Sequence, residues 1–432
     1  MIASKLPYFN FRIIINLLLS LLPISFIAGN LVINLNMILI ILASLLFWKK
    51  DFFKIKILLI DKLLIFLFLF SVLTSLINYN NFLSSDPILT KENLIKSIAY
   101  LRYLLFYFSI RLIIEKNYFN IKTFFISASI CVIFVTFDLF LQFFSGKDIF
   151  GFPKSDLKVS GPFGDELIAG SYLQRFCLFL FFLVPFYKDY FTKINLNFLL
   201  LLVFVLLFFS IVISGNRMSV ILFVLLFVFL FLLEKNLRKF LIILISFIFI
   251  LFLTLYNFFP YIEFLTSNFL RQANQIIFSL DEIYKNNLNM NFSNTYLKEF
   301  YLGYMTWQEN LILGGGINSF YLNCKINYGL CTSHPHNYYL EILSELGIVG
   351  MFITLAIFIK LFHLFFMIRN KLYLSNENNA IASFALLFFI EIFPFKTTGS
   401  FFTTGNSTYI FLLIAVIVGF SNKLIYYKKK QT

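Results

Sequence analysis

The sequence predicts an all-α, polytopic integral membrane protein with about twelve transmembrane helices and one large helical loop subdomain. Of its 432 residues, 60% are hydrophobic and only 13% are charged. The mean hydropathy of +0.87 lies well above that of soluble globular chains. Apolar runs close to the roughly 20 residues that cross a bilayer recur from one end to the other. A soluble globular protein is therefore excluded.

Twelve apolar runs each predict one transmembrane helix. They cover roughly residues 13–28, 31–48, 57–77, 98–114, 121–144, 167–187, 195–213, 218–233, 240–260, 347–368, 379–395 and 403–420. The first run follows Lys5 and Arg12 as in a signal peptide, but it lacks an Ala-x-Ala-like end and a second run follows at once. We therefore expect it to be an uncleaved helix.

The basic residues predict the orientation of the chain. Lys and Arg concentrate in every second connecting segment, for example 49–56, 235–239 and 423–430. Because cytoplasmic loops collect basic residues near the ends of spans, we expect both termini to be cytoplasmic. The net charge of +14 then reflects anchoring in the lipid bilayer, and no nucleic-acid partner is expected.

The predicted topology divides the chain into three parts. Residues 1–260 hold the first nine helices, residues 261–346 form an outer loop subdomain, and residues 347–432 hold the last three helices and a cytoplasmic tail. Within the loop, residues 274–288 and 294–311 show the helical spacing of apolar residues. The Gly-rich stretch "LGGGINSF" then interrupts this pattern.

Four ionisable residues fall in the outer halves of predicted helices, where burial of a charge is costly and favours a functional role. They are Arg102, Asp138, Arg175 and Glu391. They could form a polar cluster that opens outward, or they could be ion pairs that hold helices together. Arg111 lies nearer an inner end, where a long side chain can reach the interface.

Arg217 begins the eighth predicted span, in the tight outer turn "ISGNRMSV". A guanidinium beside the free amides of a helix N-terminus suits a phosphate, because its fork is bidentate and the helix dipole adds positive potential. The alternative is an interfacial anchor without chemistry.

The stretch "TSHPHNYYLEILSELGIVG" at 332–350 predicts a short amphipathic helix at the outer membrane surface. Pro335 suits its first turn, and Gly347 is expected to end it before the tenth span. Glu341 and Glu345 would lie one turn apart on its polar face.

Two of the three histidines, His334 and His336, lie in this stretch, and we expect His336 in the first helical turn. A helix N-terminus disfavours added positive charge, so the imidazole should stay neutral. A neutral imidazole can act as a general base near neutral pH.

Two other roles for these histidines stay open, namely a structural helix cap and a metal site. A metal site is disfavoured because His363 is predicted near the opposite membrane face. Cys324 and Cys331 also lack the short C-x-x-C spacing that is typical of zinc sites. We therefore expect no metal and no cofactor.

Cys324 and Cys331 are both predicted to lie outside, and they enclose the short loop "CKINYGLC". A disulfide is sterically allowed there, and it would restrain the segment that leads to His334. Two free thiols are the alternative. Cys131 and Cys177 fall within helices and should be buried apolar groups.

Four motifs resemble those of the O-antigen ligase and O-antigen polymerase superfamily. His336 and Asn337, followed by nine residues, Gly347, two residues and Gly350, match the outer-loop signature of that family. The stretches "LILGGGINSF", "ISGNRMSV" and "KVSGPFGDELIAGSYL" are similar to its PLLGVGxGxF, Ser-x-x-Arg and Gly-x-Phe-Gly motifs. Together the motifs span residues 158–350.

The resemblance implies a metal-independent, inverting glycosyltransferase of the bacterial inner membrane with a periplasmic active site. Its donor would be a glycan on undecaprenyl pyrophosphate. Its acceptor would be a sugar hydroxyl of lipid A-core for a ligase, or another lipid-linked glycan for a polymerase. His336 would take the proton from the acceptor hydroxyl, and Arg217 would hold the pyrophosphate.

Further candidates for substrate binding follow from the resemblance and from the charges. Lys158 stands where several family members have Arg, and Lys298 is the cation nearest to a second such position. Lysine keeps the charge but loses the bidentate fork. Arg175, Arg102 and His334 complete the set.

Two other classes of function stay open. A twelve-helix transporter or flippase for a lipid or small anion would commonly show repeated halves and polar sites near the midplane, and neither is evident in the sequence. A non-catalytic glycan-binding protein is disfavoured by the expected neutral histidine. The sequence does not separate a ligase from a polymerase, because both use the same donor chemistry.

Overall fold

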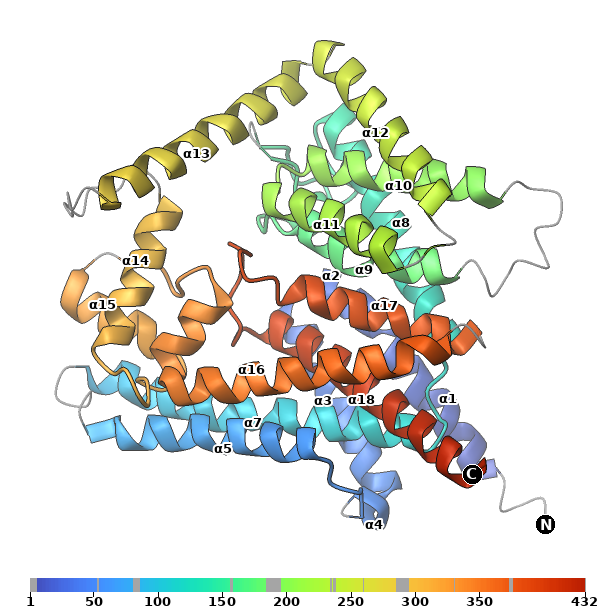
Figure 1. Cartoon of the computed structure of the whole chain (residues 1–432), viewed down its shortest axis with the longest axis vertical. Helices are drawn as coiled ribbons and strands as arrows, with labels where there is room; N and C mark the ends of the chain where they lie inside the picture. The colour runs from blue at the N-terminus through green and yellow to red at the C-terminus, as the bar shows by residue number, and fades with distance from the viewer. Residues whose placement is uncertain are drawn as a thin grey trace. The chain divides into compact units, whose positions relative to one another are not determined.

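Helices make up the regular structure of the computed structural model (Figure 1). The structure describes residues 6–52, 54–80, 86–155, 158–183, 196–233, 235, 238–258, 260–284, 295–329, 331–372 and 376–431. Over these ranges the one β-type pairing is an isolated bridge between Lys147 and Pro153. The predicted all-α class is confirmed.

The helices before residue 184 are α1 Leu6–Ser20, α2 Leu22–Ala28, α3 Asn30–Phe47, α4 Lys49–Phe52, α5 Leu59–Ile77, α7 Pro87–Glu115, α8 Ile121–Ser145, the 3-10 helix η1 Gly161–Phe163 and α9 Ala169–Leu183. Those after residue 195 are α10 Leu196–Ile213, α11 Arg217–Leu233, α12 Arg238–Phe258, α13 Pro260–Tyr284, α14 Thr295–Gln308, α15 Ser319–Tyr328, α16 Tyr338–Leu372, α17 Asn376–Glu391 and α18 Thr404–Gln431. Every predicted apolar run overlaps one of these helices.

Seven of the described helices are long and apolar enough to cross a membrane, or eight if the bent pair α1 and α2 forms one span. Four shorter apolar helices lie at Ala169–Leu183, Phe198–Ile213, Arg217–Leu233 and Ile381–Glu391. A multi-pass membrane protein is therefore confirmed, and the number twelve stays a prediction.

The chain forms two compact units, whose segments alternate along the sequence. The first unit comprises Met1–Asn36, Phe119–Asn274 and Lys371–Glu391. The second comprises Met37–Tyr118, Gln275–Asn370 and Ile392–Thr432. The predicted division into 1–260, 261–346 and 347–432 follows membrane topology instead, and it stays a prediction.

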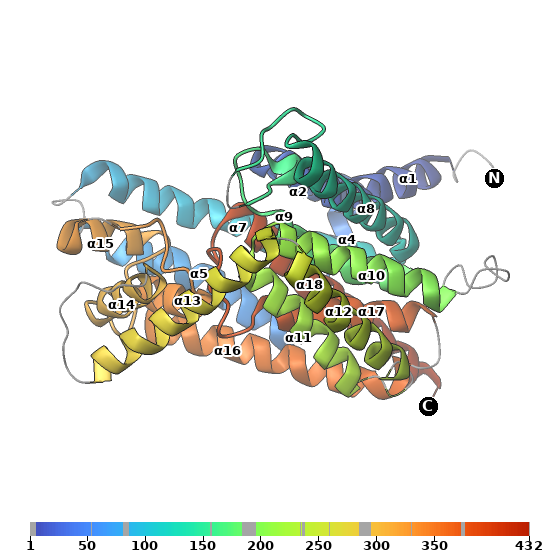
Figure 2. The same cartoon turned by 90° about the horizontal axis from the view of Figure 1, so that it is seen from above.

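In the first unit, α8 and α9 lie side by side (Figure 2). The rings of Phe124 on α8, Phe179 on α9 and Phe384 on α17 pack with centroids 4.9 to 5.8 Å apart. Arg175 on α9 donates to the Glu391 carboxylate at the end of α17, with N–O distances of 2.6 and 3.1 Å. These two residues therefore form a helix-holding ion pair, one of the two predicted alternatives.

In the second unit, α7 packs against α5 and α18. Arg111 on α7 is fully buried, and its guanidinium binds Asp61 and, at 2.8 Å, Glu115. The Tyr107 hydroxyl donates to the same Asp61 carboxylate at 2.6 Å. The expectation that Arg111 reaches the interface is wrong. Its guanidinium is buried inside the protein, and the carboxylates of Asp61 and Glu115 compensate the cost of burying its charge.

Candidate active site

The helix that carries the histidine motif begins later than predicted. α16 starts at Tyr338, and Asn337 caps it, because its Oδ1 accepts from the backbone N–H groups two and three residues further on at 3.0 and 3.2 Å. His336 precedes the cap and has a left-handed backbone with φ 54°. The prediction that Pro335 and His336 lie in the first turn is wrong, since Asn is a strong N-cap residue.

α16 is kinked at Gly347, the residue at which a helix end was predicted, with φ 62° and ψ −167°. Two N–H groups of segment 311–316 donate to carbonyls just before the kink at 2.7 and 3.2 Å. Two N–H groups just after the kink donate back to that segment at 2.9 and 3.2 Å. A Cβ on Gly347 would lie 2.3 Å from the Ile312 carbonyl oxygen, and one on Gly314 would lie 2.4 Å from the backbone of Glu345. The two glycine motifs are thus the two sides of one backbone contact.

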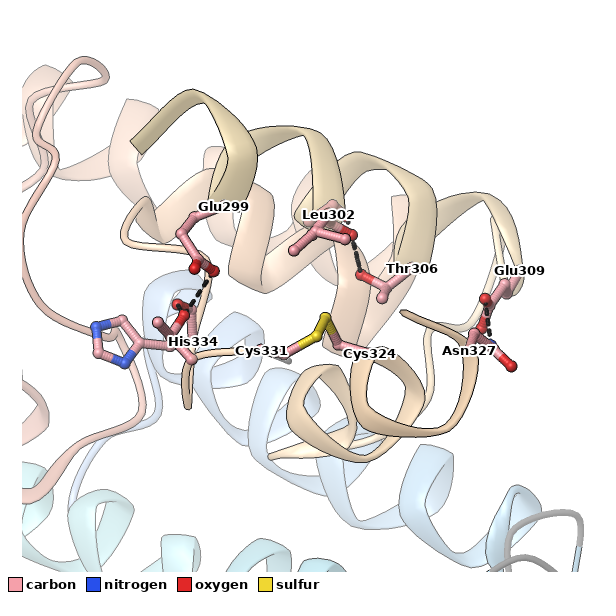
Figure 3. Close-up of a disulfide and its surroundings, with 10 residues drawn as sticks. Glu299, Leu302, Thr306, Glu309, Cys324, Asn327, Cys331 and His334 are labelled. Carbon is pink, nitrogen blue, oxygen red and sulfur yellow. Dashed lines mark hydrogen bonds between the residues drawn. A yellow bond between two sulfur atoms is a disulfide. The ribbon is translucent and has the colours of Figure 1, made fainter. Parts of the chain in front are cut away.

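Residues 332–336, which hold both histidines, form the histidine segment. This segment lies against α14 (Figure 3). The rings of His334 and His336 have centroids 4.4 Å apart, and Tyr296 on α14 meets His336 edge-on at 6.0 Å. The Thr332 hydroxyl lies 2.6 Å from Glu299 Oε2 and 2.9 Å from the His334 carbonyl oxygen, so it donates to one of them at a time. The site therefore combines two imidazoles with one carboxylate.

Burial lowers the pKa of both imidazoles. The pKa of His334 falls to about 4, because burial is reinforced by the neighbouring His336. Burial also lowers the pKa of His336, while the negative charge of Glu299 acts in the opposite direction. Burial therefore favours the neutral form of both rings near pH 7.

The segment between α17 and α18, residues 392–401, holds the start of α16 in place. Asn337 donates through Nδ2 to the Pro394 carbonyl at 2.8 Å, and the buried Lys396 donates to the Tyr338 hydroxyl at 3.0 Å. Sequence reasoning missed Lys396, although a single lysine inside the apolar stretch "FPFK" was a signal for a buried partner.

The two glutamates that were predicted on the polar face of α16 are both buried. Glu341 accepts from the Ser400 hydroxyl at 2.5 Å and from the Phe401 backbone N–H at 2.6 Å. Glu345 is also buried. Segment 392–401 covers one of these carboxylates, and a helical pattern alone does not reveal such a partner from sixty residues away.

Cys324 on α15 and Cys331 form a disulfide, with Cα atoms 5.9 Å apart (Figure 3). This separation lies within the usual range. The bridge ties the start of the histidine segment to α15, so the hypothesis of a disulfide is confirmed. Cys131 and Cys177 are free and buried, as predicted.

In the first unit, Arg217 begins α11 directly after a turn in which Gly215 has φ 68°. Its guanidinium donates to the Gln272 side-chain oxygen on α13. Burial lowers the pKa of Lys158, and the positive charge of Arg217 lowers it further. Two of the predicted cations therefore lie close together.

An apolar pocket of about 610 Å³ lies beside α11 in the same unit. Helices α10 to α13 line it with side chains such as Phe223, Phe249 and Phe269. Along α11 the lining runs from Arg217 to Val228, a rise of about 16 Å. The charged group thus lies at one end of an otherwise apolar wall, an arrangement that suits an apolar chain with an anionic head.

The remaining predicted residues have separate surroundings. Asp138 accepts from the Ile149 backbone N–H at 2.8 Å in the first unit. Arg102 belongs to the second unit and donates to the Tyr103 hydroxyl at 2.8 Å. Lys298 lies on α14. Among the residues that the structure describes, no group of three or more His, Cys, Asp or Glu side chains could hold a metal ion.

Residues 202–355 match the family model described as O-Antigen ligase. This segment contains Arg217, the Gly-rich segment and the complete histidine motif, whereas Lys158 lies before it. No curated protein matches the chain. The match confirms the resemblance of the motifs to the O-antigen ligase superfamily over this segment of the chain.

Proposed function

We propose that the protein moves a glycan from undecaprenyl pyrophosphate to a sugar hydroxyl of lipid A-core, as an O-antigen ligase. The family match supports glycosyl transfer of the ligase or polymerase type. The reaction would take place at the periplasmic face of the bacterial inner membrane, with residues 261–346 as the periplasmic loop subdomain and both termini in the cytoplasm. The alternating basic segments support this orientation.

The apolar pocket beside α11 is the observation that carries the choice of donor. Burial of each methylene group of a lipid tail contributes about 0.8 kcal/mol, so the phenylalanine-lined wall favours a long hydrocarbon chain. Arg217 at its end would bind the pyrophosphate through its planar fork, and Lys158 would add a second positive charge. A soluble nucleotide-sugar donor has no hydrocarbon chain to pack against this apolar wall.

His336 would act as general base in an inverting displacement. The acceptor oxygen attacks the anomeric carbon of the donor glycan, the bond from that carbon to the pyrophosphate oxygen breaks, and the acceptor proton passes to the imidazole. The leaving pyrophosphate is stable as an anion, so the proposed reaction needs no acid to protonate it and no metal to neutralise it. Arg102 and Lys298, in the unit that holds His336, are proposed as substrate contacts, and Arg175 would act through its pair with Glu391.

A polymerase with the same donor chemistry is the second candidate, because the family match includes both activities. Electrophoresis of surface glycan from a deletion strain separates them. Loss of all polymer from lipid A-core, with long lipid-linked chains accumulating, supports the ligase. A core that carries single repeat units supports the polymerase, and units trapped on the cytoplasmic side would indicate a flippase and contradict both.

His336→Ala should abolish transfer while the protein stays in the membrane, since the base is lost without loss of core packing. His334→Ala should have a milder effect, because its ring is the neighbour and not the base. Complementation of the deletion strain, with immunoblotting of membranes, measures both. Near-normal polymer in the His336→Ala strain would make the assignment of the base wrong.

A further inference from the structure

We propose that Glu299 is the positioning carboxylate of the general base, which orients His336 and balances the charge that His336 gains during transfer. This inference rests on the proposed function. It assigns a role to a residue that no motif contains, and it follows from the way α14 meets the histidine segment within the second unit.

One face of α14 is directed at the histidine segment. Tyr296 contacts the His336 ring, and a Cβ on Gly303 would lie only 2.8 Å from the Pro335 side chain. Glu299 lies three residues after Tyr296 and four before Gly303. Residues at this spacing share one helix face. Glu299 is therefore on the face that packs against the segment, and it is 8% exposed.

The Thr332 hydroxyl links this carboxylate to the histidines. It lies 2.6 Å from Glu299 Oε2 and 2.9 Å from the His334 carbonyl oxygen. The disulfide at Cys331 fixes the residue before Thr332 to α15. The hydroxyl donates to one of these oxygens at a time, so it holds the Glu299 carboxylate beside the backbone of His334 in a part-buried arrangement.

During transfer, the Glu299 carboxylate would balance the positive charge that forms on His336. When His336 accepts the acceptor proton, its neutral ring becomes an imidazolium in a half-buried place, where an unpaired charge is disfavoured. His334 cannot compensate, because a second imidazole offers no negative charge. Glu299, whose charge acts on His336, would supply that negative charge. When the product leaves, the proton passes from His336 to solvent and the ring is neutral again.

The titration of His336 tests the inference without any substrate. The titratable groups around the segment are Glu299, Tyr296 and Lys298 on α14, His334 beside the ring, and Lys396 with Tyr338 at the start of α16. The chain contains three histidines, so histidine-selective labelling gives few NMR signals, and a His334→Gln variant assigns them. Glu299→Gln keeps an acceptor for Thr332 but removes the charge, and it should lower the pKa of His336 by about one unit.

Glu309→Gln is the matched control. Glu309 follows α14 and accepts from the Asn327 side chain at 2.6 Å, away from the histidines (Figure 3). Its replacement should leave the titration of His336 in place. An unchanged pKa of His336 in Glu299→Gln, or an equal shift in both variants, would overturn the inference.

Transfer kinetics give a second readout, with donor and acceptor lipids extracted from the deletion strain. Glu299→Gln should lower kcat about tenfold, the equivalent of one pKa unit, with the donor KM unchanged and the acidic limb of the rate profile moved to lower pH. Glu299→Asp should recover part of the rate. A residue that only supports the fold would leave that limb unmoved.

The His336→Ala variant, assayed alongside, distinguishes an error in the proposed function from an error in the role of Glu299. If His336→Ala is inactive and Glu299→Gln has normal kinetics, the proposed function stands and the role of Glu299 is wrong. If His336→Ala transfers glycan normally, the general base itself is misassigned, whatever the titration of Glu299→Gln shows.

Discussion

Gly347→Ala should disrupt the backbone contact on which the histidine motif depends. The backbone of Gly347, at φ 62° and ψ −167°, occupies a region that is essentially restricted to glycine. A side chain there costs about 1–3 kcal/mol in strain. The new Cβ would also lie 2.3 Å from the Ile312 carbonyl oxygen, so segment 311–316 has to move.

The size of the effect follows from the hydrogen bonds that this movement breaks. Four backbone hydrogen bonds join segment 311–316 to α16 across the kink. Each contributes about 0.5–1.5 kcal/mol net. Loss of all four, added to the strain, amounts to about 3–9 kcal/mol. This is a large share of the roughly 5–15 kcal/mol that stabilises a typical protein.

A matched glycine provides the control. Gly146, at the end of α8, has φ 82° and no atom within 4 Å of an added Cβ. Gly146→Ala should therefore cost only the left-handed strain of about 1–2 kcal/mol. Thermal unfolding in detergent, followed by size-exclusion chromatography, compares the two variants. Equal unfolding midpoints for Gly347→Ala and Gly146→Ala would refute the close-contact reasoning.

Three further changes have defined outcomes. Arg217→Lys keeps the charge but loses the planar fork, so binding of a labelled undecaprenyl pyrophosphate should weaken about tenfold; unchanged affinity would leave Arg217 an anchor. Replacement of Cys324 and Cys331 by Ser should destabilise the protein by about 2.5 kcal/mol, and full thiol labelling of the parent without reductant would contradict the bridge. The folded state lowers the pKa of His334 to about 4, so its contribution to the free energy of unfolding is fully present above pH 6.5 and is lost as pH falls toward 4. The unfolding midpoint of His334→Gln should therefore decline less over this pH range than that of the parent.

The membrane fold could be predicted because its signal is local. Each apolar run contains its own evidence for a helix, and every predicted run overlaps one in the structure. Partners distant in sequence were not predictable in this way. Arg111 looked like an interfacial residue until Asp61, fifty residues earlier, proved to be its counter-ion.

In the candidate site, too, residues inside sequence motifs could be predicted, whereas residues that matter through packing with distant segments could not. His336 and Arg217 could be found because fixed motifs surround them, and Lys158 was found through its place in another motif. Glu299 and Lys396 belong to no motif, and their importance depends on which segments pack together. The start of α16 was misplaced because a proline was given more weight than the Asn cap that follows two residues later.

The spacing of the histidine signature has a physical reading. Asn337 caps α16 and Gly347 kinks it, so the nine residues between them form a helical segment about 13 Å long. His336 lies directly before one end of this helical segment, and backbone hydrogen bonds hold the other end to the Gly-rich segment. Insertion of one residue would turn one end relative to the other by about 100°. The signature therefore fixes both the distance and the rotation of His336 relative to the Gly-rich segment.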